Sequence, residues 1–228
     1  LWVVVFAAAF AWVESAVVIY LREIFFDDGF RFPLRIIWDG EQRVVSPLVR
    51  VEVGREIATI VVLAAVGVLA GLAHPVFGLD HLLAMLAVGL WAAQQQGAAR
   101  WALPLTFVAT MLLGGLAGFA GFQMPLMETG IAGSVLALGL LVAVAVRPPL
   151  VVAAALTALF AASHGVAHGL ELPELSSPWG YAAGFVVATA ALHAAGYALV
   201  RVMPQAVAPL IRMAGAASAA TGVWLLAS

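Results

Sequence analysis

The sequence predicts an all-α polytopic membrane protein, a transmembrane helix bundle of about eight spans. Of its 228 residues, 64% are hydrophobic and only 10% are charged, and the mean hydropathy is +1.09. A soluble domain is about half apolar and about a quarter charged. The apolar residues fall in long blocks, and about 20 helical residues cross a bilayer core about 30 Å thick. Strands of a membrane β-barrel would instead give alternating segments of about 10 residues.

Short stretches rich in proline, glycine or polar residues separate the apolar blocks, and such stretches end helices. We expect spans at residues 1–21, 57–73, 79–96, 101–121, 128–146, 150–168, 179–200 and 206–227. Inside them glycine and alanine are frequent, as in LLGGLAGFAG and GIAGSVLALG. Small residues let membrane helices approach closely, so we expect a compact bundle.

Residues 22–56 differ from the rest of the chain. They hold six of the ten arginines and seven of the twelve acidic residues, so they predict a solvated loop between the first two spans. Aromatic residues lie among the arginines at its ends, as is typical of the headgroup region. The run VRVEV alternates as a short strand would. We therefore expect an N-terminal region, 1–72, with two spans and this Arg-rich loop, followed by a six-helix domain, 73–228.

The arginines predict how the chain is oriented in the membrane. Short cytoplasmic loops carry the excess of positive charge, and here arginine supplies it because the chain has no lysine. The arginines fall in every second connection: residues 22–55, Arg100, Arg147, and Arg201 with Arg212. The connections between them contain none. The Arg-bearing loops are therefore predicted to lie in the cytoplasm, and the connections that carry histidine pairs are predicted to lie outside.

The motif HPVFGLDH places His74, Asp80 and His81 in an apolar setting. Pro75 and Gly78 make one regular helix improbable here, so we expect His74 to end one helix and Asp80 and His81 to open the next. Irregular backbone at membrane depth is tolerated only where it is buried in protein or lines a wet cavity. Ionisable side chains beside such a break predict a functional cavity.

A second pair, His164 and His168, is four residues apart and so lies on one helical face, and Glu171 follows. Two imidazoles one turn apart, with a carboxylate near them, are a common ligand set for a metal ion. The chain has no cysteine, which leaves nitrogen and oxygen as the main ligand atoms. Such atoms suit nickel, cobalt, zinc, iron or copper.

Ordinary structural roles compete with these interpretations. Asp80 is also a favoured N-cap residue for the helix that follows it. A single histidine in a membrane helix is more often a hydrogen-bonding strut between helices, and this is our expectation for His193. Glu128 begins a span. The methionines are expected to be apolar filling, although thioethers bind soft metals: Met85, Met111, Met124 and Met127.

Four segments, AHPVFGLDHLLAMLAVGLWAAQ, METGIAGSVLALGLLVAVAV, FAASHGVAHGLELP and ATAALHAAG, resemble the HupE/UreJ family of hydrogenase- and urease-accessory membrane proteins in order and spacing. The resemblance covers residues 70–228 and leaves residues 1–69 unassigned. It implies a permease of a bacterial inner membrane that imports nickel, or alternatively cobalt, for maturation of a metalloenzyme. The positions that match the family's motifs are His74, Asp80 and His81, then His164, His168 and Glu171, with Glu128 and His193 matching in less defined roles.

Three classes of function remain open. A permease would bind Ni2+ weakly at the two motifs and release it into the cell. A membrane metalloenzyme would retain a catalytic ion, with Glu171 or Asp80 as its base. A scaffold subunit would use its histidines structurally and would bind a partner through the loop 22–56. The sequence contains no phosphate-binding loop, dinucleotide fingerprint or basic stripe, which argues against nucleotide and nucleic-acid binding.

Overall fold

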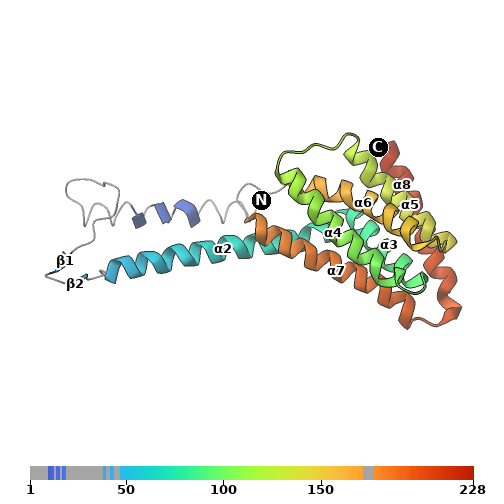
Figure 1. Cartoon of the computed structure of the whole chain (residues 1–228), viewed down its shortest axis with the longest axis horizontal. Helices are drawn as coiled ribbons and strands as arrows, with labels where there is room; N and C mark the ends of the chain where they lie inside the picture. Colours follow the sequence, from blue (N-terminus) through green and yellow to red (C-terminus); the bar gives the residue numbers. More distant parts are fainter. Residues whose placement is uncertain are drawn as a thin grey trace. The chain divides into compact units, whose positions relative to one another are not determined.

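The structure is a computed structural model, and it describes residues 10–12, 14–15, 17–18, 38–39, 42–43, 47–171 and 177–228. These residues are almost entirely helical (Figure 1), which confirms the all-α bundle. The elements with assigned bounds are β1 (Trp38–Asp39), β2 (Gln42–Arg43), α2 (Pro47–Phe77), α3 (Leu79–Gln94), α4 (Ala99–Phe119), α5 (Met127–Val144), α6 (Leu150–Leu170), α7 (Pro178–Val202), the short 3-10 helix η1 (Gln205–Val207) and α8 (Ala208–Ala227).

Seven of the predicted spans correspond to observed helices, α2 to α8. Among the described residues, six helices are long and apolar enough to cross a membrane, and α3 is a shorter apolar helix of 16 residues. The chain is therefore a multi-pass membrane protein. The remaining prediction, a span at 1–21, lies mostly outside the described residues, of which 10–12, 14–15 and 17–18 are helical.

The prediction that residues 22–56 form a loop is wrong for residues 47–56. Helix α2 begins at Pro47 and includes the run VRVEV. Proline is favoured at the first helical position, since its φ is already helical and it lacks an N–H that would have no partner. The helix then continues into an apolar span, and helix elongation is cooperative, so the local alternation is overridden. In the part of the loop that the structure describes, β1 and β2 form one short antiparallel pair.

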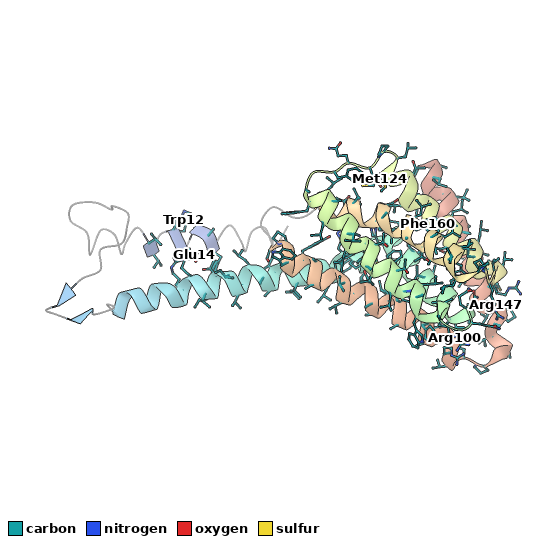
Figure 2. The ribbon with its side chains drawn as sticks, viewed as in Figure 1. Trp12, Glu14, Arg100, Met124, Arg147 and Phe160 are labelled. Atoms are coloured by element: carbon teal, nitrogen blue, oxygen red, sulfur yellow. The ribbon has the colours of Figure 1, made fainter. Side chains whose placement is uncertain are left out.

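The chain forms two compact units, residues 1–66 and residues 67–228. In the first unit, Glu14 accepts hydrogen bonds from the Arg55 guanidinium and from the Thr59 hydroxyl. Figure 2 shows Glu14 directed toward α2. Arg55 also bonds Glu56, with 2.8 Å between Nη2 and Oε1. This network joins the described N-terminal residues to α2. The proposed domain division at residue 72 stays a prediction.

In the second unit, helices pair closely: α4 with α6, α5 with α8, and α3 with α7 (Figure 1). Glycine makes the close approach possible. A Cβ on Gly165 of α6 would overlap the Met111 carbonyl of α4, and a Cβ on Gly89 of α3 would overlap the His193 carbonyl of α7. Helix α3 also contacts α4, α5 and α8, and ten of its 16 residues are buried, so it is the central helix.

Arginines and glutamines gather at one end of this unit, which we call the arginine end. Arg147 Nε donates to the Gln94 carbonyl at 2.7 Å, and Arg100 Nε donates to the Gln95 carbonyl at 3.1 Å. Gln95 Nε2 and Trp91 Nε1 both donate to the Val146 carbonyl, at 3.0 and 2.9 Å. These bonds satisfy carbonyls at helix ends that have no partner within their own helix. Arg100 and Arg147 lie together, far from Met124 (Figure 2).

Candidate metal site

The break within HPVFGLDH lies where the sequence predicts it. His74 is in the last turn of α2, and Asp80 is in the first turn of α3. Gly78 alone separates the two helices, with its N–H donating to the His74 carbonyl at 3.1 Å. This junction defines the histidine end of the bundle. It lies at the opposite end of α3 from Gln94 and the arginines.

Asp80 orients the His81 imidazole. Its Oδ1 lies 2.7 Å from His81 Nδ1 and also accepts the His81 backbone N–H at 2.8 Å. A carboxylate oxygen only accepts, so Nδ1 carries the proton and Nε2 keeps its lone pair. The N-cap residue of α3 is Gly78, and Asp80 lies in the first turn, so the prediction that Asp80 is the N-cap is wrong. A carboxylate that fixes the tautomer of a histidine is common beside metal ligands.

The two histidine motifs meet at the histidine end. The His81 ring centroid is 4.5 Å from that of His168 and 4.8 Å from that of His164, and the His74 centroid is 4.7 Å from that of His168. One ring nitrogen from each of His74, His81 and His168 lies within 4.8 Å of the others. Two segments far apart in the sequence therefore contribute to one cluster of four imidazoles.

Ser134 of α5 fixes the tautomer of His164. The serine hydroxyl donates to the Ile131 carbonyl at 2.7 Å and lies 2.9 Å from His164 Nε2. A hydroxyl has a single proton, so toward His164 the serine oxygen accepts and Nε2 carries the proton. His164 Nδ1 is left with its lone pair, in a side chain that is 0% exposed.

Buried ring nitrogens in this cluster lack hydrogen-bond partners. Within the described residues these are His81 Nε2, His164 Nδ1 and both nitrogens of His168. A buried polar atom without a partner costs about 1–3 kcal/mol, so such atoms in a native protein need an explanation. A bound metal ion would supply the missing partner. The donor set thus fits a transition metal that prefers imidazole.

The two glutamate candidates lie at the edge of the cluster or away from it. Glu171 follows the end of α6, is half exposed, and has Oε2 3.9 Å from His74 Nε2. Glu128 is exposed in the first turn of α5. Among the described residues, no hydrogen bond or ion pair joins Glu128 to a histidine. Of these two glutamates, the structure therefore brings Glu171 to the histidines.

Side chains that the sequence did not single out complete the surroundings. Phe185 of α7 lies 3.8 Å from His168 between ring centroids, and Tyr181 lies 6.2 Å from His74. Both are buried, and Ser134 is 0% exposed. Their positions in the sequence are those of ordinary packing residues in a helix. Only the tertiary arrangement shows that they lie beside the histidines. The one available signal for Ser134 was a polar residue within an apolar span.

Comparisons with known proteins cover the part of the chain that carries these residues. A family model described as HupE / UreJ protein matches residues 54–225. The chain belongs to the HupE/UreJ family. Protein HupE of Rhizobium leguminosarum bv. viciae is 47% identical to this HupE/UreJ protein over 165 residues, which are 72% of this chain and 86% of that protein. No solved structure matches the chain.

The family match begins within α2 of the HupE/UreJ protein, so it takes in a longer part of the chain than the resemblance at 70–228. All four histidines of the cluster lie within the matched residues. The cluster thus belongs to the part of the chain that the family shares.

Proposed function

We propose that this HupE/UreJ protein imports a divalent transition metal ion, nickel, across a bacterial inner membrane. The observation that carries the proposal is the cluster of His74, His81 and His168, whose ring nitrogens lie within 4.8 Å of one another at one end of a membrane helix bundle. Three imidazoles can hold a transition metal and leave further coordination positions for water or for the next ligand.

Each residue of the site would have a separate role in binding the ion. His81 would bind through Nε2, because Asp80 holds the proton on Nδ1. His74 and His168 would complete the first binding site. Glu171, half exposed beside His74, would attract the hydrated cation, since a carboxylate in a low-dielectric mouth concentrates cations. His164, whose ring packs on His81, would receive the ion next.

The positions of the arginines indicate the direction of transport. The arginine end would face the cytoplasm by the positive-inside rule, so the histidine end would face outside and meet the incoming metal. Nickel is the family-implied cargo, with cobalt as the nearest alternative. Neutral imidazole ligands without thiolates suit such borderline metals.

The test is 63Ni uptake into cells that express this chain, compared at matched expression with His74→Ala, His81→Ala and His168→Ala. We expect each substitution to lower uptake by about tenfold or more, because each removes a ligand. Thr221→Ala on the exposed side of α8 is the control and should transport normally. Uptake no greater than in cells without the protein would contradict the proposal.

A further inference from the structure

A second set of donor atoms lies deeper in the bundle than the histidine cluster. It consists of Met85 of α3, Met111 of α4, and Thr189 and His193 of α7, which we call the deep donor group. All four side chains are buried, with Met85 and Thr189 at 0% exposure, Met111 at 2% and His193 at 3%. Met85 lies along α3 between His81 and Gln94, so the group is between the histidine end and the arginine end.

The two methionine sulfurs converge on one hydroxyl. Thr189 Oγ1 is 3.2 Å from Met85 Sδ and 3.9 Å from Met111 Sδ. A threonine within a helix usually bonds the carbonyl four residues earlier, and a thioether is a weak acceptor. Three soft or neutral donor atoms from three different helices therefore meet at one point. Met85 and Met111 are buried, as expected of apolar filling. Their sulfurs also contact the Thr189 hydroxyl, which that expectation did not include.

His193 lies one turn farther along the same face of α7 as Thr189. In a helix the side chain leans toward the N-terminal end, which for His193 is toward Thr189. Neither of its ring nitrogens has a hydrogen-bond partner among the described residues. The expected role as a hydrogen-bonding strut is therefore wrong. The close contact between α7 and α3 is made instead by Gly89 against the His193 backbone.

One aromatic ring, Phe107, contacts both the outer histidines and the deep donor group. The Phe107 ring lies 5.8 Å from His164 and 5.1 Å from His193 between centroids, so it contacts both. Gly165, next to His164, packs against the backbone of Met111. The Phe107 ring thus lies between the outer histidines and His193 inside the bundle.

We propose that the deep donor group is a second binding site for the transported cation, which holds the ion between the histidine cluster and the arginine end. His193 would supply the strongest ligand, and the two thioethers and the hydroxyl would supply weak ones. Neutral nitrogen and sulfur donors accept a borderline divalent transition metal and do not suit Mg2+ or Ca2+, which need oxygen ligands. The site would therefore act as a selectivity step. This proposal rests on the proposed transport function.

The first test uses the purified, detergent-solubilised full chain and Ni2+ alone. Equilibrium 63Ni binding is measured for the unmodified protein, His193→Ala and the double variant Met85→Leu/Met111→Leu. Leucine keeps the apolar volume of methionine but has no sulfur, so folding should be preserved. We expect His193→Ala to lose the more weakly bound ion and to keep the ion at the outer cluster, and its uptake in cells to fall by about tenfold.

Controls separate this site from the outer one. Met213→Leu replaces an exposed methionine of α8 and should leave binding and uptake unchanged. In His74→Ala, whose outer site is disabled, X-ray absorption of the remaining bound nickel should show sulfur neighbours, and these should vanish when Met85→Leu/Met111→Leu is added. The loss of sulfur neighbours is a signature that a purely structural role would not produce.

Each outcome decides between the two proposals. If His193→Ala and the double methionine variant bind and transport Ni2+ as the unmodified protein does, while His74→Ala fails, the deep site is excluded and the transport function stands. If His74→Ala also transports normally, the histidine cluster is not the transport site. If the unmodified protein gives no more uptake than cells without it, the transport function itself is wrong. Selective loss of uptake and of the sulfur signature in the deep variants, with the outer ion retained, supports the second site.

Discussion

Ser134 shows how a single hydroxyl can control metal binding without touching the metal. Because its proton is given to the Ile131 carbonyl, it can only accept from His164 Nε2, which leaves Nδ1 free to bind. We expect Ser134→Ala to weaken Ni2+ binding by about tenfold or more, measured by equilibrium 63Ni binding to purified protein. Ser134→Thr keeps the hydroxyl and should restore most of the affinity. Ser218→Ala, which removes another buried hydroxyl that lacks a partner, is the control and should change nothing; equal affinities for Ser134→Ala and Ser218→Ala would refute this role. Asp80→Asn should likewise weaken binding by about tenfold, because the amide no longer supplies the negative charge that holds the proton on His81 Nδ1. Unaltered affinity in Asp80→Asn would show that the carboxylate does not act on the imidazole.

Helix pairing depends on glycines at which no side chain fits. A Cβ at Gly165 would overlap the Met111 backbone, which cannot move aside as a flexible side chain could. We expect Gly165→Ala to lower the free energy of unfolding by about 1–3 kcal/mol, seen as a lower melting temperature of the solubilised protein. Gly133→Ala is the matched control, since nothing lies within 4 Å of the Cβ that it would add, and alanine there should stabilise the helix by up to about 1 kcal/mol. A melting temperature for Gly165→Ala at or above that of Gly133→Ala would contradict this account of the α4–α6 contact. Helix positions themselves could be predicted, because hydropathy and breakers are local signals. The start of α2 at Pro47 could not, because the charged, alternating run VRVEV joins a helix only through the apolar span that follows it.

Across the whole molecule, the sequence identified the two histidine motifs but not how they combine. His74, Asp80 and His81 were predictable as a broken helix entrance, and His164 and His168 as one helical face. That the motifs form one cluster depends on how α2, α3 and α6 pack, which spacing alone does not specify. Ser134 and Thr189 were not predictable for the same reason: their roles come from contacts with other helices. Most of the loop 22–56 lies outside the described residues, so its role in binding a partner stays a prediction.

The clustered imidazoles also predict how transport responds to pH. Neutral imidazole binds a metal and protonated imidazole does not, so protons and Ni2+ compete for the same nitrogens. Ni2+ uptake should therefore fall as the pH is lowered, because protons displace the ion from the ring nitrogens. The measurement is initial 63Ni uptake into vesicles at about pH 7.5 and about pH 5.5 under a fixed driving force. Thr221→Ala should show the same fall as the unmodified protein, whereas uptake that is unchanged between the two values would mean that the histidines do not bind the ion directly.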